Sequence, residues 1–237
     1  MVKAQSFSES EIIYADSDGK PMADNTKQFR WIVTIKENLE CLFADNDHVF
    51  IAGDLLWYPV EGDNKTCQAP DAMVVFGRPK GDRGSYKQWL ENQIAPQVVF
   101  EILSPGNTKA EMRQKWQFYQ RFGVEEYYLY DPDANYLQGW WRRGDQLEMI
   151  AAIDNWQSPL LQIRFQLESP QLAIFYPDGS RFLTTLEIKQ KAELAEQRAR
   201  TAEQQAQQER QRAQEAEAKL ARLEAQLQAL GINLEES

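Results

Sequence analysis

Two carboxylates stand in segments of the sequence that are otherwise apolar. Asp71 follows a proline at the start of APDAMVVFG, and Glu101 lies inside QVVFEILSP. An ionised carboxylate in such surroundings is costly unless it is paired or bound to a cation. Two carboxylates on adjacent strands could share one Mg²⁺, which prefers oxygen ligands and can polarise a phosphoryl oxygen and activate a bound water. The alternative is that Glu101 pairs with a lysine or arginine in the core.

The hydrophobic pattern predicts the elements that would position these carboxylates. Residues 97–105 are apolar on both pleat faces apart from the first residue and Glu101, which is typical of a central strand covered on both sides. Residues 28–43 repeat apolar side chains at helical spacing, and Asn25 or Thr26 could cap that helix. The other expected strands are 48–53, 54–60, 69–77 and 125–132, and the second expected helix is 109–122, ended by Gly123. This order predicts an α/β or α+β fold with a central mixed sheet.

The remaining segments of the core are more polar. Residues 136–182 are expected to form an antiparallel meander, with strands at 136–141, 146–151 and 161–167. The segment RPKGDRGSYKQ is expected to be a surface loop, and with the tryptophan after it forms the best local candidate for contacting a phosphate backbone. Its basic residues are Arg78, Lys80, Arg83 and Lys87. The alternative is an ordinary polar loop.

Composition limits the classes of function. The formal net charge of the 237 residues is −10, which argues against indiscriminate binding to nucleic acid, so such a role would rest on a local basic patch or on metal ions. Two cysteines, Cys41 and Cys67, and one histidine, His48, exclude a zinc cage or a disulfide scaffold and favour a reducing compartment. No apolar run is long enough to span a bilayer, and the first ten residues lack the apolar core of a signal peptide. We therefore expect a soluble, cytoplasmic protein without a membrane partner.

The last fifty residues differ sharply from the rest. Every Trp, Tyr and Phe lies at or before Phe182, and the residues beyond it are almost entirely Ala, Glu, Gln, Arg, Lys and Leu. From Ile188 to Leu230, Ala and then Leu recur at alternating steps of four and three, interrupted only at Glu209, which predicts a coiled coil ended by Gly231. The alternative is a single solvated helix. The expected divisions are an N-terminal polar segment (1–25), a core domain (26–186), a coiled-coil tail (187–231) and a disordered end (232–237).

The pattern from Pro70 to Pro132 is more specific than the two carboxylates alone. It runs PDAMVVF, VVFEILSP, a helix with Lys115 and Tyr119 one turn apart, and GVEEYYLYDP. This order resembles the Uma-type family of restriction-endonuclease-like proteins, a branch of the PD-(D/E)xK nuclease superfamily. The resemblance extends from about Gln28 to Leu186 and excludes the tail. It implies a restriction-endonuclease-like core.

The resemblance implies roles for individual residues. Asp71 and Glu101 would be ligands of Mg²⁺ or Mn²⁺. The superfamily lysine, two positions after the glutamate, would fall on Leu103, which cannot serve, so Lys115 on the following helix is the candidate in its place. Its amine would stabilise the attacking water or the charge that develops on phosphorus. The alternative for Lys115 is a surface pair with Glu111.

The resemblance also suggests auxiliary positions. Tyr119 is expected to pack beside Lys115 and orient it. The superfamily often adds a carboxylate from its first helix, for which Glu37 and Glu40 are available, although each is more typical of a solvated helix residue. Asp54 is a possible outer ligand. Asp131 matches a family position, but a strand-ending turn explains it equally well.

The function implied by the resemblance is Mg²⁺-dependent hydrolysis of phosphodiester bonds, with DNA as the expected substrate. A homodimer or higher oligomer, formed through the core, the coiled coil or both, would suit cutting of two strands. The alternative is a catalytically inactive scaffold or binding module that keeps the nuclease fold and acts through its coiled coil. The acidic net charge and Leu103 favour that alternative, whereas Asp71, Glu101 and Lys115 favour an enzyme.

Overall fold

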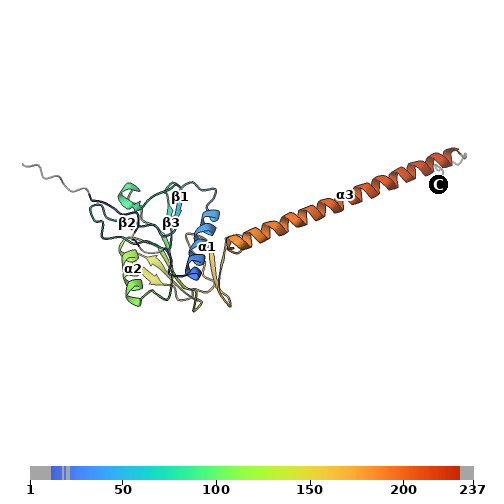
Figure 1. The fold of residues 1–237 in the computed structure, drawn as a ribbon. Coiled ribbons are helices and arrows are strands. Elements are labelled where there is room, and N and C mark those ends of the chain that lie inside the picture. Colours follow the sequence, from blue (N-terminus) through green and yellow to red (C-terminus); the bar gives the residue numbers. More distant parts are fainter. Residues whose placement is uncertain (1–11, 18, 20–21, 230–237) are drawn as a thin grey trace, which may run out of the picture. The chain divides into compact units, whose positions relative to one another are not determined.

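The computed structural model describes residues 12–17, 19 and 22–229, and the chain divides into two compact units, Met1–Thr184 and Thr185–Ser237. A six-stranded mixed sheet organises the first unit, in the order β1-β3-β5-β6-β7-β8 (Figure 1). Its strands are β1 (Val49–Ala52), β3 (Ala72–Phe76), β5 (Val98–Ile102), β6 (Glu126–Asp131), β7 (Tyr136–Arg143) and β8 (Gln146–Met149). Within this sheet β5 and β6 pair in parallel and the other neighbouring strands pair antiparallel, so the central mixed sheet expected from the sequence is confirmed.

Two helices cover opposite faces of this sheet. Helix α1 (Thr26–Leu42) begins at Asn25, whose side chain accepts the N–H groups of Lys27 and Gln28, and it packs Ile32, Ile35 and Leu39 against one face. Helix α2 (Lys109–Arg121) is the crossover between β5 and β6 and packs Tyr119 against the other face (Figure 1). Strand β5 has apolar neighbours on both faces, which is why its sequence is almost continuously apolar. Both expected helices are therefore confirmed.

Two other expectations for the core were wrong. The segment 161–167 does not extend the meander; β9 (Arg164–Leu167) pairs with β10 (Leu172–Phe175) in a separate two-stranded sheet. The reason is that Phe165 is fully buried against Phe100 and Tyr128, so this hairpin covers a face of the main sheet instead of lengthening its edge. The segment 78–88 is also more than a loop, since β4 (Tyr86–Lys87) pairs in parallel with β2 (Trp57–Tyr58) and a short 3₁₀ helix, Gln88–Leu90, follows.

A buried carboxyl at the start of β6 joins the sheet to the chain after β8. Glu126 is fully buried, and its carboxyl accepts hydrogen bonds from Ser158 Oγ at 2.5 Å, the Leu160 N–H at 2.8 Å and Tyr128 Oη at 2.9 Å. Burial raises the pKa of Glu126 above its ordinary value, and the Ser158, Leu160 and Tyr128 hydrogen bonds offset part of that rise. The folded state therefore holds a proton on Glu126 more tightly than the unfolded chain does.

This gives a pH dependence of known sign. The stability contributed by Glu126 is fully present below the carboxyl's ordinary pKa of 4.5 and is lost as the pH rises through the higher pKa of the folded state. In Glu126→Gln, which cannot titrate, we expect the free energy of unfolding to fall less over this range than in the wild type. Urea denaturation at several pH values measures the difference, with exposed Glu61→Gln as the control. A pH profile that is the same in Glu126→Gln and the wild type would contradict the prediction.

The second unit contains one long helix. Helix α3 (Thr185–Ala229) has 45 residues, which at 1.5 Å per residue is about 68 Å, and none of its side chains is buried. The helix expected from the heptad pattern is confirmed as far as Ala229; Leu230, Gly231 and residues 232–237 lie outside the described residues, as does much of the N-terminal polar segment. No helix in the described part of the chain is long and apolar enough to cross a membrane.

Candidate active site

Asp71 and Glu101 are brought together by the pairing of β3 with β5. Ala72 lies opposite Phe100 in this antiparallel register, so the preceding Asp71 lies opposite Glu101. Oδ2 of Asp71 accepts the N–H of Ile102 at 2.6 Å, which fixes the carboxyl against β5. Asp71 is 7% exposed and Glu101 2% exposed, so two acidic groups lie next to each other almost out of contact with water.

Helix α2 supplies the groups that contact Glu101. Lys115 Nζ lies 2.6 Å from Oε2 of Glu101, and the hydroxyl of Tyr119, one turn further along, donates a hydrogen bond to Oε1. The start of the helix is fixed by a capping box, in which Thr108 Oγ1 accepts the Glu111 N–H and the Glu111 carboxylate accepts the Thr108 N–H. Both oxygens of Glu101 are therefore oriented by side chains of α2.

This geometry changes the expected role of Tyr119 and sharpens that of Lys115. Tyr119 does not orient Lys115; both side chains bind Glu101, one on each oxygen. Lys115 reaches into the site instead of lying on the helix surface. The Lys115–Glu101 ion pair is also what the alternative interpretation of Glu101 requires, so the pair by itself does not separate an active site from a buried structural contact.

The charges in the site do not balance. Burial, and then the negative charge of Glu101, raise the pKa of Asp71 well above its ordinary value. Burial by itself lowers the pKa of Lys115, but the charges of Glu101 and Asp71 outweigh it and raise that pKa above its ordinary value. Lys115 therefore stays positively charged, and one ammonium faces two carboxyl groups. A further positive charge would relieve this excess.

A cavity of about 360 Å³ opens onto both carboxyl groups and Lys115. Its wall carries three further acidic residues, Asp24, Asp54 and Glu111. Among the described residues, no three His, Cys, Asp or Glu side chains converge closely enough to enclose a metal ion by themselves. Mg²⁺ does not need such a cage, because it usually binds through one or two carboxylates and completes its shell with water and substrate phosphates. The oxygen donors of Asp71 and Glu101 fit that ion, and they do not fit a structural zinc site.

Of the auxiliary residues, the structure places Asp54 at the site and not Glu37. Asp54 lines the cavity, and its backbone N–H donates to Pro70 O at 3.0 Å, next to Asp71. Glu37 is half exposed on α1, where it and Glu40 pair with Lys36 at 3.1 and 2.9 Å, and neither lines this cavity. The first helix therefore contributes no carboxylate to the site.

Sequence patterns missed a buried amide beside the site. Gln28 lines the cavity, is 6% exposed, and donates from Nε2 to Ile102 O at 2.8 Å while its Oε1 accepts the Asp24 N–H. It thus ties α1 and Asp24 to the end of β5. In the sequence, the feature that could have revealed the role of Gln28 was its position as a polar residue on the inner face of the first helix. Asp131 accepts the N–H groups of Asp133 and Ala134, which supports the turn interpretation.

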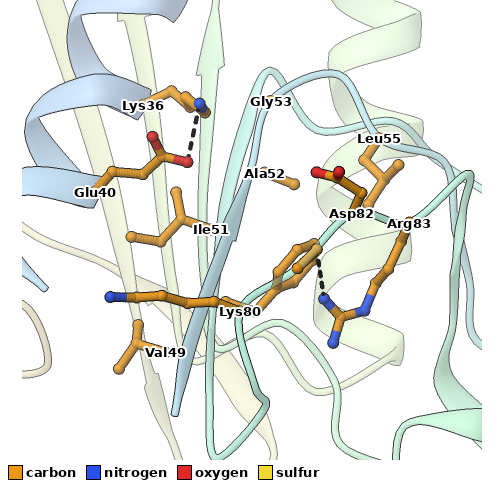
Figure 2. Close-up of a pocket in the computed structure, with 12 residues that line it drawn as sticks. Lys36, Glu40, Val49, Ile51, Ala52, Gly53, Leu55, Lys80, Asp82 and Arg83 are labelled. Atoms are coloured by element: carbon orange, nitrogen blue, oxygen red, sulfur yellow. Dashed lines mark hydrogen bonds and ion pairs between the residues drawn. The ribbon is translucent and has the colours of Figure 1, made fainter. Parts of the chain in front are cut away.

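Three of the four basic residues of this segment make contacts within the domain. Arg78 and Arg83 both bind Glu91, each with an Nε–Oε distance of 2.7 Å, and the guanidinium of Arg83 lies over the ring of Phe50. Lys80 Nζ donates to the carbonyls of Phe43 and Ala44, at the end of α1. Figure 2 shows Lys80 and Arg83 in the wall of a separate cavity beside β1, of about 500 Å³.

Contact of this segment with a phosphate backbone stays a prediction. Arg78, Lys80 and Arg83 hold the segment against the rest of the domain. Glu91, which follows the 3₁₀ helix, pairs with both guanidiniums; burial raises the pKa of Glu91, but its hydrogen bonds with Arg83 and Arg78 and their charges outweigh burial and lower that pKa below its ordinary value. The fourth residue, Lys87, lies with Nζ 5.4 Å from the ring centre of Tyr14.

A mixed sheet with two carboxyl groups on adjacent strands and a lysine on the crossover helix defines a restriction-endonuclease-like, nuclease-type protein. The chain belongs to the Uma2 family, described as "putative restriction endonuclease", which matches residues 11–171. A solved structure described as a putative nuclease belonging to DUF820, from Anabaena variabilis ATCC 29413, is 18% identical with a TM-score of 0.43, over 59% of this chain and 74% of that chain. No curated protein is significantly similar in sequence.

Proposed function

We propose that the protein is a metal-dependent endonuclease that hydrolyses phosphodiester bonds of DNA, with Mg²⁺ or Mn²⁺ as the cofactor. The observation that carries the proposal is the buried pair Asp71 and Glu101 at the wall of an acidic cavity, faced by the single ammonium of Lys115. Membership of the Uma2 family supports a nuclease-type activity. The choice of metal rests on the oxygen donors of the site, and the choice of DNA as substrate rests on the family's description as a putative restriction endonuclease.

Each residue has a separate task in this mechanism. Asp71 and Glu101 would hold the ion, which would supply Lewis-acid stabilisation and lower the pKa of a water molecule. The Ile102 N–H and the Tyr119 hydroxyl fix the orientation of the two carboxylates before the ion binds. The ammonium of Lys115 stabilises the negative charge that develops on the phosphoryl oxygens in the transition state.

A second candidate function is that of a scaffold. It is favoured by the direct Lys115–Glu101 ion pair, by Leu103 at the superfamily lysine position, and by the internal use of Arg78 and Arg83. A scaffold has no need of a divalent cation. Metal binding therefore separates the two functions directly.

The test is calorimetric titration of Mn²⁺ and Mg²⁺ into the full chain, together with nicking of supercoiled plasmid. We expect the wild type to bind the ions and nick DNA, and Asp71→Ala and Glu101→Ala to do neither. Glu37→Ala is the matched control, since it removes a carboxylate from the same domain outside the cavity and should behave as the wild type. Failure of the wild type to bind either ion would overturn the enzymatic proposal and favour the scaffold.

We further propose that α3 joins two or more copies in a coiled coil, placing two active sites in one assembly. A helix of this length with no buried side chain gains no tertiary packing of its own, and most helical stability in proteins comes from such packing. The Leu seam supplies the apolar surface that association would bury. Neither Cys41 nor Cys67 takes part in a disulfide, which fits the cytoplasmic location proposed for this assembly.

Substitutions on and off the Leu seam test the coiled coil. We expect Leu223→Asp with Leu227→Asp to convert the assembly to monomer and lower the helix content, because two charges would enter the apolar seam. The matched control is Ala221→Asp with Ala225→Asp, which adds the same charge outside the seam and should stay associated. Sedimentation equilibrium measures the mass and circular dichroism the helix content. Equal masses for the two double variants would contradict the proposal.

A further inference from the structure

A second, largely aromatic groove lies on the same side of the sheet as the active site. It has a volume of about 220 Å³ and runs between α2 and strands β6 and β7. Its wall is formed by Met112, Arg113 and Trp116 of α2, with Tyr127, Gln138 and Trp140 of the sheet. Met112 also lines the cavity that holds Asp71 and Glu101, so the two hollows share a wall.

The groove gathers polar groups whose hydrogen-bonding capacity is unused. Trp116 Nε1 and the hydroxyl of Tyr127 are buried and have no hydrogen-bond partner among the described residues. An unsatisfied buried donor costs about 1–3 kcal/mol, so two in one place require an explanation. Burial, and then the charges of Glu101 and Asp71, raise the pKa of Tyr127 well above its ordinary value, so its hydroxyl remains a donor.

The groove also has an aromatic wall, formed by Trp116, Tyr127 and Trp140. The rings of Tyr127 and Trp140 are stacked, with centroids 4.9 Å apart and planes inclined by 16°. The volume is below the roughly 300–1,000 Å³ of pockets for drug-sized ligands, so the groove suits a single planar ring system. The Arg113 side chain is exposed, and the side chains of Arg113 and Gln138 make no hydrogen bond or ion pair with a described residue. A cation and an amide are thus available beside an aromatic surface.

We propose that this groove binds one unpaired nucleobase of the DNA strand whose phosphate lies at Asp71 and Glu101. The base stacks on the aromatic wall, its ring nitrogens and carbonyls accept hydrogen bonds from Trp116 and Tyr127, and Arg113 contacts a neighbouring phosphate. The substrate is accordingly single-stranded or locally opened DNA, since a base cannot enter a pocket while stacked in a duplex. This inference rests on the proposed nuclease function and specifies its substrate.

Access to the two buried donors requires a small movement. Both atoms are shielded from water, so the base reaches them only after a neighbouring side chain shifts. Met112 lies at the boundary between the two cavities and is unbranched and flexible, so it can move at small energetic cost.

The experiment measures binding of a fluorescein-labelled oligodeoxythymidylate, and of a labelled duplex of the same length, by anisotropy in EDTA. Without divalent metal no cleavage occurs, so binding at the groove is measured separately from catalysis. We expect the wild type to prefer the single strand, and Tyr127→Phe and Trp116→Phe each to weaken that binding about threefold to tenfold, the range for one hydrogen bond. Arg113→Ala should weaken binding and reduce the slope of log affinity against log salt by about one.

The melting temperatures of the variants show whether Tyr127 contacts the ligand or stabilises the fold. If the Tyr127 hydroxyl has no partner in the free protein, Tyr127→Phe leaves the melting temperature unchanged or raises it while oligonucleotide affinity falls. The exposed Tyr136→Phe is the matched control and should change neither quantity. Wild-type affinity in Tyr127→Phe, Trp116→Phe and Arg113→Ala would overturn the proposal, as would failure of the wild type to bind the single strand. Plasmid nicking that persists in that case would leave the nuclease function standing, with its substrate contacts elsewhere.

Discussion

Asp71→Asn is expected to remove metal binding and DNA cleavage and, at the same time, to make the metal-free protein more stable. Asparagine has the same shape as aspartate and keeps an oxygen that can accept the Ile102 N–H, now made at 2.6 Å. It lacks the negative charge that a cation requires. Loss of a group that stabilises transition-state charge lowers the rate by about 10²–10³-fold, and loss of the ion itself should lower it at least as much.

The gain in stability follows from the electrostatics of the site. Asp71 is 7% exposed, lies opposite Glu101, and has a pKa raised well above its ordinary value, first by burial and then by the charge of Glu101. A carboxyl whose pKa is raised in the folded state loses its contribution to stability as the pH rises above the ordinary carboxyl pKa, and asparagine, which does not titrate, avoids that loss. Each kcal/mol gained would appear as a rise of roughly 2–4 °C in melting temperature for a domain of this size.

Thermal unfolding with and without Mn²⁺ measures both effects in one experiment. The wild type should be stabilised by Mn²⁺ according to the ratio of ion concentration to dissociation constant, and Asp71→Asn should not respond. Glu37→Gln, on the exposed side of α1, should respond as the wild type. If Asp71→Asn were less stable than the wild type in EDTA and still responded to Mn²⁺, Asp71 would be a structural residue and not a ligand.

The sequence was sufficient to locate the strands and the two carboxylates because both depend on local pattern. β3, β5 and β6 are apolar runs bounded by turn residues, and a charged residue inside such a run is visible without a structure. That Asp71 and Glu101 face each other follows from strand pairing, which apolar pattern suggests but does not fix. The approach of Lys115 to Glu101 came from the family resemblance, because a helix of thirteen residues offers several faces to a sheet.

The rest of the site depends on contacts between residues distant in the sequence. Gln28 reaches Ile102 across 74 positions, and its place is decided by how α1 packs on the sheet. The ion pairs of Arg78 and Arg83 depend on the same kind of contact: composition shows a basic segment but does not show that Glu91 accepts both guanidiniums. The prediction that β9 extends the meander was wrong because an alternating strand pattern identifies one buried face of a strand. It does not identify the layer against which that face packs.

Lys115→Met is expected to destabilise the metal-free protein more than any other substitution considered, by about 3–5 kcal/mol, because it leaves the Glu101 carboxylate buried without its partner. The Lys115 side chain is 22% exposed and that of Glu101 only 3%, so water cannot replace the lost ammonium well. Methionine preserves the length of the side chain and the helix propensity at this position. The midpoint of urea denaturation in EDTA measures the loss.

The double variant Lys115→Met with Glu101→Gln separates the destabilisation caused by the unpaired charge of Glu101 from the destabilisation caused by altered packing. Glutamine keeps the shape of Glu101 and can still accept the Tyr119 hydroxyl, so the double variant should be more stable than Lys115→Met alone. Contacting residues of this kind show coupling energies of about 0.5–3 kcal/mol. If the double variant were as unstable as Lys115→Met, packing and not charge would account for the loss.

The response of Lys115→Met to Mn²⁺ then distinguishes an active site from a structural ion pair. In a site that binds a divalent cation through Asp71 and Glu101, the ion replaces the missing positive charge, so Mn²⁺ should restore much of the lost stability while cleavage stays impaired. The double variant, which has lost one of the two carboxylates, should not be rescued. In a structural ion pair, Mn²⁺ would leave Lys115→Met as unstable as it is in EDTA. Stability and activity would separate in the first case because the metal substitutes for Lys115 as a neighbour of Glu101 but not as the group that stabilises the phosphoryl charge.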